Sequence, residues 1–197
     1  MINSIPKFYP LIPGSKFPGD WFSGIVPTNI QVGENTMLDS SHCFKNYHSQ
    51  LDIGLKIGSN VTLWRTSLAA EENGLIEIGD FCFLANASLV CSRRIKIGSR
   101  VFISGGVTIV DSDFHPLDPL ERLLDIIALS PLGNRKERPE FKVEDVEIED
   151  DVWIGLNATI LKGVTIGKGA YIYPGSLVLE NVLPGQKVSG NPAKPIV

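Results

Sequence analysis

The amino-acid sequence predicts an all-β protein, a parallel β-helix of short strands that one long inserted arm interrupts. Two observations carry this prediction. An aliphatic residue recurs at every sixth position toward the carboxyl end, and glycine and proline are over-represented. The 19 glycines and 13 prolines make up 32 of 197 residues, about 16%, where about 12% is average. Because each proline ends a helix and each glycine weakens one, this composition argues against an all-α fold.

The six-residue spacing is strict from residue 148 onward. Its aliphatic positions are Ile148, Ile154, Ile160, Ile166, Ile172 and Val178, and the residues four positions later are Val152, Ala158, Val164, Ala170, Ser176 and Val182. A helix does not explain a period of six, because six steps of about 100° leave successive residues about 120° apart. A hairpin strand would alternate with period two. Three units of strand and turn instead close one coil of about 18 residues, and such coils stack about 4.8 Å apart.

Looser copies of the repeat lie upstream of the strict part. One group begins at Ile78-Gly79, and after one extra residue near Arg93 the spacing resumes at Ile97, Ile103 and Ile109. We therefore expect a β-helix domain over residues 31–183. Residues 1–30 are rich in proline and aromatic side chains and are expected to cap the open end, whose strand edges would otherwise be unpaired. Residues 184–197 are expected to form a C-terminal tail.

The repeat stops at Val110 and resumes at Val146, so residues 111–145 form an inserted arm. Within it, Asp118-Pro119-Leu120-Glu121 has the order of a helix N-cap, a proline at N1 and a glutamate at N3. This order predicts a short helix near residues 119–129. Apolar side chains at helical spacing are expected to dock that helix on the rest of the protein; they are Leu120, Leu123, Leu124 and Ile127.

Charge and composition exclude several classes of protein. The net charge is −4 and the pI about 5.4, which gives no electrostatic basis for binding nucleic acid. The short run Arg135–Arg138 is interpreted as a solvated loop. No apolar stretch is long enough for a membrane span, and the first six residues lack the pattern of a secretion signal, so a cytoplasmic location is expected. Three cysteines without CxxC spacing (Cys43, Cys82 and Cys91) are expected to be reduced and buried.

The repeat follows the pattern [LIV]-[GAED]-x-x-[STAV]-x and resembles that of the hexapeptide-repeat acyltransferases. Val152–Gly155 and Gly163–Gly167 resemble the last coils of that family, and Gly190–Lys194 resembles the closing segment of its maltose/galactoside O-acetyltransferase branch. These motifs cover about three-quarters of the chain. The resemblance implies a left-handed parallel β-helix, a homotrimer, acetyl-CoA as co-substrate and no metal. It also implies that the catalytic histidine of one subunit faces a cleft lined by its neighbour.

The same resemblance implies roles for three residues of the acceptor site. The run from His115 to Arg122 resembles the segment that carries the general base, so His115 is the expected catalytic residue. Histidine suits this role because imidazole titrates near neutral pH. Asn86 matches an asparagine that contacts the acceptor. Asp113 is expected in the same site, and Asp113 and Asp118 are both candidates to orient the imidazole, although Asp118 already serves as the helix cap.

Residues of the coenzyme A site are implied in the same way. They are Trp153, Gly155, Leu156, Lys162, Pro174 and Lys194. Two positions depart from the family pattern, Pro174 and Leu179-Glu180, and Lys162, Lys168 or Lys194 can bind coenzyme A in their place. The helical N-terminal domain of the maltose branch is absent, so the acceptor need not be a maltose-like sugar.

The sequence thus favours an acetyl-CoA-dependent O-acetyltransferase that acts on a hydroxyl of a carbohydrate or related acceptor. N-acetylation of an amino sugar and acetylation of a xenobiotic are the nearest alternatives. A zinc enzyme like γ-type carbonic anhydrase would need three histidine ligands. His42 and His48 lie before the main repeat, and the coils carry no His-x4-His pair. A third alternative is a solenoid that serves as a non-catalytic scaffold.

Overall fold

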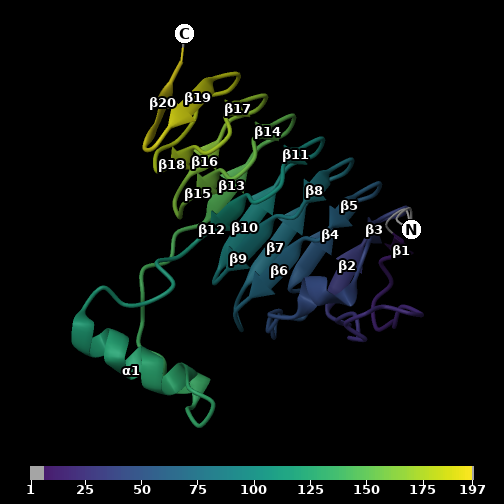
Figure 1. Ribbon diagram of the computed structural model, residues 1–197, viewed down its shortest axis with the longest axis vertical. Helices are drawn as coiled ribbons and strands as arrows, with labels where there is room; N and C mark the ends of the chain where they lie inside the picture. The colour runs from purple at the N-terminus through teal and green to yellow at the C-terminus, as the bar shows by residue number, and fades with distance from the viewer. Residues whose placement is uncertain (1–6, 197) are drawn as a thin grey trace, which may run out of the picture.

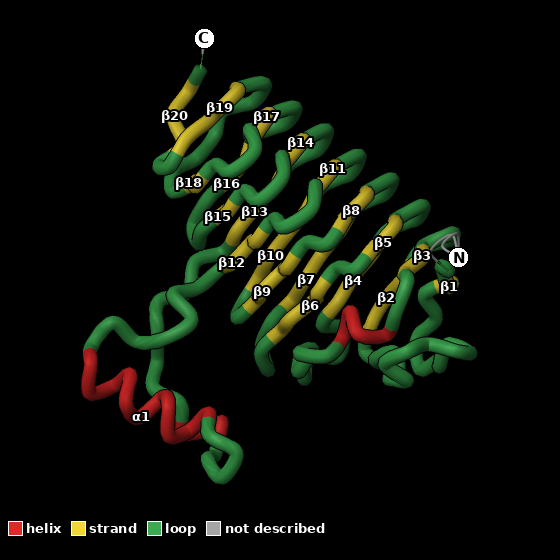
Figure 2. The backbone as a smooth tube through the Cα atoms, in the orientation of Figure 1, coloured by secondary structure: helices red, strands yellow, loops and turns green. Residues whose placement is uncertain are grey.

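The computed structural model describes residues 7–196 as one solenoid of parallel strands with an arm that stands away from it (Figures 1 and 2). Successive strands turn through three sheets, so that each coil contributes one strand to each face. This confirms the predicted β-helix of six-residue repeats. The expected cap includes residues 1–6, which lie outside the described residues.

Among the described residues the sheets contain nine, six and five strands. The nine-stranded sheet consists of β1 (Tyr9–Pro10), β3 (Met37–Leu38), β5 (Thr62–Trp64), β8 (Phe83–Ala85), β11 (Phe102–Ile103), β14 (Trp153–Ile154), β17 (Tyr171–Ile172), β19 (Lys187–Gly190) and β20 (Ala193–Pro195). The six-stranded sheet consists of β2 (Ile30–Val32), β4 (Leu55–Ile57), β7 (Leu75–Ile78), β10 (Arg94–Ile97), β13 (Val146–Ile148) and β16 (Thr165–Ile166). The five-stranded sheet consists of β6 (Ser67–Ala70), β9 (Ser88–Cys91), β12 (Thr108–Val110), β15 (Thr159–Ile160) and β18 (Leu177–Val178).

The core is a set of aliphatic columns that run through the stacked coils. Ile97, Ile148 and Ile166 face one another in register in the six-stranded sheet and are 2%, 0% and 0% exposed. The positions six residues apart are all buried, as the period predicted. Each column removes large branched side chains from water, and this burial stabilises the fold by about 25 cal/mol for every Å² of apolar surface buried. The three cysteines are free and buried in the same core, as expected.

Both ends of the solenoid are covered by chain that pairs with the nine-stranded sheet. Strand β1 runs antiparallel to β3, and Tyr9 stacks on Phe17 with ring centroids 4.8 Å apart. At the other end, β19 pairs in parallel with β17 and β20 folds back on β19. The segment expected as a separate tail from residue 184 therefore continues the sheet. These pairings satisfy backbone groups that an open solenoid would expose.

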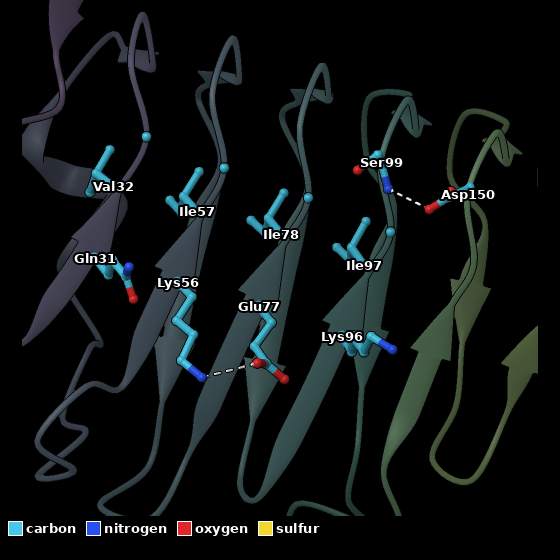
Figure 3. Close-up of a pocket in the computed structure, with 14 residues that line it drawn as sticks. Gln31, Val32, Lys56, Ile57, Glu77, Ile78, Lys96, Ile97, Ser99 and Asp150 are labelled. Carbon is cyan, nitrogen blue, oxygen red and sulfur yellow. Dashed lines mark hydrogen bonds and ion pairs between the residues drawn. The ribbon is translucent and has the colours of Figure 1, made fainter.

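The chain passes from sheet to sheet along three edges of the solenoid. The six/nine edge, where the six-stranded sheet passes to the nine-stranded one, carries a column of glycines: Gly33, Gly58, Gly79 and Gly98. The coils approach closely there because a side chain of one coil caps a backbone N–H of the coil before it. Ser59 N–H donates to Asp80 at 2.6 Å and Ser99 N–H to Asp150 at 2.8 Å. Figure 3 shows the groove of about 580 Å³ along this edge, with Ser99 bonded to Asp150 and Lys56 paired with Glu77.

Replacing Gly79 by alanine is expected to destabilise the fold by about 2 kcal/mol or more. The added Cβ would lie 2.6 Å from Ser99 Oγ and 2.7 Å from the carbonyl carbon of Gly98, so backbone must move. Gly105→Ala is the matched control, because its Cβ would meet its nearest neighbour at 3.5 Å. Urea unfolding of both variants measures the difference, and equal stabilities would contradict the close-approach argument.

The arm leaves the solenoid after β12 and returns at β13, and it contains α1 (Pro119–Leu129). Asp118 caps α1 by accepting hydrogen bonds from the N–H groups of Leu120 and Glu121, which confirms the predicted helix and its cap. The described residues also form two short 3-10 helices, η1 (Ser41–Phe44) near the N-terminus and η2 (Arg135–Glu137) in the arm.

The predicted docking of α1 through its apolar stripe is wrong within this chain. Leu120, Leu123, Leu124 and Ile127 are between 53% and 75% exposed, and α1 instead buries Asp125 and Ala128. The reason is that α1 stands away from the coils (Figure 1). Ion pairs of Asp125 with His115 and Arg138, rather than apolar contacts, hold the inner face of α1. Among the described helices, none is both long and apolar enough to cross a membrane.

Candidate active site

A histidine–carboxylate pair lies within the arm. His115 Nδ1 is 2.6 Å from Asp125 Oδ2, which belongs to α1. The imidazole is 49% exposed, whereas the Asp125 side chain is fully buried. When the proton of the neutral ring lies on Nδ1, facing the carboxylate, Nε2 keeps a free lone pair. The arrangement can therefore accept a proton from a bound molecule at Nε2.

Asp125 is held as an anion by Arg138, which lies where the arm returns. Arg138 Nε donates to Asp125 Oδ1 at 2.6 Å, and the Arg138 side chain is 11% exposed. Burial alone would raise the pKa of the Asp125 carboxyl, but the hydrogen bonds from Arg138 and His115 outweigh it and lower the pKa. The interpretation of Arg135–Arg138 as a solvated loop is thus wrong at Arg138.

The imidazole is oriented by Asp125, and not by either carboxylate expected from the sequence. Asp118 caps α1, and Asp113 forms an ion pair with Lys162. Asp113 stays beside His115 in the chain and accepts a hydrogen bond from its backbone N–H through the Asp113 carbonyl, at 2.7 Å. One signal for Asp125 was present in the sequence: it is the single carboxylate within the otherwise apolar run of residues 123–129.

A second set of expected site residues lies along the nine/five edge, where the chain passes from the nine-stranded to the five-stranded sheet. Backbone hydrogen bonds link the turns of successive coils along it: Gly106 N–H donates to Asn86 at 2.9 Å, and Gly175 N–H donates to Leu156 at 2.8 Å. Pro174 lies against Gly155, where a Cβ would be 2.7 Å from the proline nitrogen. Asn86, Gly155, Leu156 and Pro174 therefore follow one another along a single edge.

Trp153 lies on the nine-stranded sheet, on the strand that leads into this edge. Its ring stacks on Tyr171 of the next coil, with centroids 4.2 Å apart and an interplanar angle of 16°. On preceding coils, Phe83 stacks on Phe102 in the same register. Trp153 is thus part of an aromatic ladder on the outer face of the solenoid.

A hollow of about 690 Å³ opens beside Asn86, between the N-terminal cap and the coils. Its lining includes Trp21, His42, Trp64 and Arg65, none of which the sequence pattern singled out as a site residue. Trp21 is 73% exposed, and its ring lies 4.9 Å from that of His42. Aromatic faces next to imidazole, guanidinium and amide groups can bind a hydroxylated ring.

The lysines expected to bind coenzyme A phosphates differ in their exposure and in their distance from acidic side chains. Lys162 is 19% exposed and is paired with Asp113. Lys168 and Lys194 are both 62% exposed, and their nearest acidic partners lie 3.8 Å and 3.6 Å away. Because such exposed pairs are weak, Lys168 and Lys194 can exchange their partners for a phosphate.

The two sets of residues lie on different edges of the solenoid. His115, Asp113 and Lys162 are on the five/six edge, where the five-stranded sheet passes to the six-stranded one, whereas Asn86 and Pro174 are on the nine/five edge. Within one chain, the expected residues around His115 lie together, and so do those around Asn86. The two groups lie on different edges and do not form one site. No group of three His, Cys, Asp or Glu side chains that could hold a metal ion occurs between residues 7 and 196.

The described structure is thus a parallel β-helix that carries a half-exposed histidine and a buried carboxylate on an inserted arm. Residues 145–180 match the model of the bacterial transferase hexapeptide (six repeats). Over these 36 residues, about 18% of its length, the chain is similar to this hexapeptide-repeat transferase family.

Several relatives are named acetyltransferases. A putative acetyltransferase of Schizosaccharomyces pombe is 35% identical over 111 residues, which are 56% of this chain and 46% of that protein. A 2,3,4,5-tetrahydropyridine-2,6-dicarboxylate N-acetyltransferase of Clostridium perfringens is 60% identical over 47 residues, 24% of this chain and 20% of that protein. The chain thus spans less than half the length of these curated relatives.

Solved structures share the fold. A hexapeptide-repeat acetyltransferase of Vibrio cholerae is 25% identical with a TM-score of 0.54, and the match covers 79% of this chain and 76% of that chain. AntD, an N-acyltransferase of Bacillus cereus solved with dTDP and 3-hydroxybutyryl-CoA, is 20% identical with a TM-score of 0.64, over 85% and 82% of the two chains. The likeness to AntD concerns the fold alone. Together these similarities confirm the left-handed β-helix expected from the hexapeptide repeat.

Proposed function

We propose that the protein transfers the acetyl group of acetyl-CoA to a hydroxyl of a carbohydrate or related acceptor, with His115 as general base. The observation that carries this proposal is the pair of half-exposed His115 and buried Asp125, which leaves Nε2 free to accept a proton. No other described histidine has a carboxylate partner. The arm that carries this pair interrupts an otherwise regular solenoid, as functional insertions do.

The reaction needs one base and no covalent intermediate. The acceptor oxygen attacks the thioester carbonyl carbon while Nε2 of His115 takes the hydroxyl proton. The tetrahedral intermediate then collapses, the carbon–sulfur bond breaks, and Nε2 returns the proton to the sulfur. The products are an acetyl ester and the free thiol. Burial raises the pKa of the Cys82 thiol to about 11, which agrees with assigning no nucleophilic role to that residue.

The acceptor is assigned to the hollow beside Asn86. A pyranose ring can stack on the exposed face of Trp21, and its hydroxyls can bond to the Asn86 amide and to His42. Coenzyme A is assigned to the same edge farther along the solenoid, against Trp153, Gly155, Leu156 and Pro174, with Lys194 near its phosphates. Lys168 lies between β16 and β17, on the six/nine edge, and is not assigned to this groove. Lys162 takes a smaller part, since Asp113 already neutralises its charge.

Transfer to an amine is the second candidate, because a relative carries the name N-acetyltransferase. Both candidates use the same base and thioester. They differ in the product, since hydroxylamine cleaves an acetyl ester and leaves an acetamide intact.

The test is release of the coenzyme A thiol from acetyl-CoA with a panel of methyl glucoside, methyl galactoside, methyl mannoside and glucosamine. We expect thiol release with a hydroxyl acceptor and a product that is labile to hydroxylamine. A stable product formed only from glucosamine would favour the amine. If thiol release stays at the acceptor-free rate across the panel and a wider set of hydroxyl compounds, the proposed acetyltransferase activity is contradicted.

The complete site is proposed to form between subunits of a homotrimer. The five/six edge of one copy would supply His115, and the nine/five edge of its neighbour would supply Asn86 and the coenzyme A groove. The exposed stripe of α1 supports this assembly, because Leu120, Leu123, Leu124 and Ile127 lack cover in the single chain. A cytoplasmic location is proposed on the three buried, free cysteines.

Mixing two inactive variants is expected to restore activity. His115→Ala copies keep Asn86, and Asn86→Ala copies keep His115, so about a quarter of the interfaces in a random mixture carry both residues. We therefore expect about a quarter of the wild-type rate after the two variants are co-refolded. A mixture as inactive as its parents would mean that both residues act within one chain.

A further inference from the structure

Arg138 lies at the centre of a polar cluster that joins three parts of the chain. Its Nε donates to Asp125 of α1 at 2.6 Å. Its Nη2 donates to the backbone carbonyl of Phe114, the residue before His115, at 2.9 Å. Its Nη1 donates to Glu71, in the turn between β6 and β7, at 3.1 Å. One planar guanidinium thus bonds the helix, the loop of the histidine and the solenoid.

Phe114 needs such a contact because its backbone is strained. It has a φ of +62°, in the left-handed region that non-glycine residues rarely adopt. Conformations of this kind persist only where surrounding contacts hold them. Arg138 donates a hydrogen bond to the Phe114 carbonyl, and Nδ1–H of His115 donates one to Asp125, so both the backbone and the ring of His115 are fixed.

We propose that Arg138 is a positioning residue for His115, acting through Asp125 and Phe114, and that Glu71 anchors this cluster to the solenoid. The role rests on the proposed function of His115 as the base, but the geometry is independent of the acceptor. Without Arg138, the buried Asp125 carboxylate loses its main compensating charge and becomes protonated. It then no longer fixes the proton of the neutral imidazole on Nδ1.

The first test observes the imidazole directly, without any substrate. In protein labelled with ¹⁵N-histidine, the signals of His115 are assigned by their loss in His115→Gln. We expect neutral wild-type His115 to show a protonated Nδ1 and an unprotonated Nε2. In Arg138→Ala, the two nitrogens should show a mixed or reversed pattern. Unchanged His115 signals in Arg138→Ala would overturn the proposal.

The second test measures acetyl transfer with acetyl-CoA and the best glycoside of the panel. We expect Arg138→Ala to lower kcat by about 10- to 100-fold with little change in the KM for acetyl-CoA, as for other residues that orient a functional side chain. A hollow of about 500 Å³ lies against Arg138 and Glu71. Millimolar guanidinium can therefore enter the vacated space and should restore part of the rate. A fall in kcat that guanidinium does not reverse would assign Arg138 a general packing role.

Arg135→Ala is the matched control. Arg135 is 51% exposed and contacts Glu71 at 3.4 Å, but makes no bond to Asp125 or Phe114. We expect a kcat within twofold of the wild type, whereas an effect equal to that of Arg138→Ala would overturn the specific role. Glu71→Gln, which keeps the shape of the anchor, should lower kcat by about threefold.

Arg138→Lys decides the question if Arg138→Ala does not fold, because one ammonium cannot bond Asp125, Phe114 and Glu71 together. It should shift the His115 signals in the same direction, and unchanged signals would overturn the proposal. If wild-type protein acetylates no acceptor, the proposed function fails, while the nitrogen signals still decide the role of Arg138.

Discussion

Replacing His115 by alanine is expected to lower kcat for acetyl transfer by about 10²-fold or more, because general-base catalysis by a positioned side chain contributes about 10²- to 10⁴-fold. The KM for acetyl-CoA should change little, since the coenzyme A groove is assigned to the other edge of the solenoid. Half of the imidazole faces solvent, and the Asp125 carboxylate lies behind it, so removal of the ring leaves no second base in place. Initial rates of thiol release measure the effect.

His48→Ala is the control for this variant. His48 lies beside the hollow next to Arg138, and neither of its ring nitrogens is paired with a carboxylate in the described structure. We expect its rate to stay within about twofold of the wild type. His115→Ala protein that folds normally and retains the wild-type kcat would remove His115 from the mechanism.

Replacing Asp111 by alanine is expected to destabilise the protein by about 3 kcal/mol or more. Asp111 is fully buried where the arm leaves β12. Its carboxylate accepts backbone hydrogen bonds from Ser92 at 2.7 Å, Arg93 at 2.7 Å and Arg94 at 2.8 Å. The extra residue that breaks the six-residue spacing lies in this segment, near Arg93. The Asp111 carboxylate therefore accepts hydrogen bonds from N–H groups that would bond to a neighbouring strand in a regular coil. Alanine would leave all three donors without their acceptor.

Asp145→Asn tests whether this effect depends on burial. Asp145 also bonds to Arg93, through Nε at 2.5 Å, but the side chains are 42% and 57% exposed. We expect a loss of less than about 1 kcal/mol, as for other exposed ion pairs. Urea unfolding of both variants gives the comparison. If Asp111→Ala costs no more than Asp145→Asn, the backbone bonds to Asp111 are not what stabilises the extra residue.

The solenoid itself could be predicted because its information is local and periodic. Ile154 and Ile172 lie on neighbouring coils in register, and their spacing along the chain already placed them on one inner face. The cap of α1 was equally local, since Asp118 bonds to N–H groups two and three residues away. In both cases the contacts join residues that the repeat or a single helical turn brings together.

The candidate site was only partly predictable. His115 could be singled out by its place at the start of the arm and by resemblance, and Asn86 by resemblance alone. The partner of His115 was assigned to Asp113 or Asp118, which are near in sequence, whereas the structure gives Asp125. Arg138 was interpreted as solvated because it ends a charged run, yet its side chain is 11% exposed. The only local signal for Asp125 is its place within an apolar run, and both roles depend on contacts between residues that are distant in the chain.

The sequence by itself determined the three-sided coil, its core columns, the limits of the arm and the cap of α1. Each of these depends on the period of the chain or on neighbours within a few residues. Only the tertiary structure decided how the arm returns to the solenoid. That return brings Arg138 against Glu71, 67 residues earlier, and turns the carboxylate of α1 inward while its leucines face solvent. The physical reason is that a buried charge must be paired, and its partners come from wherever the folded chain places them.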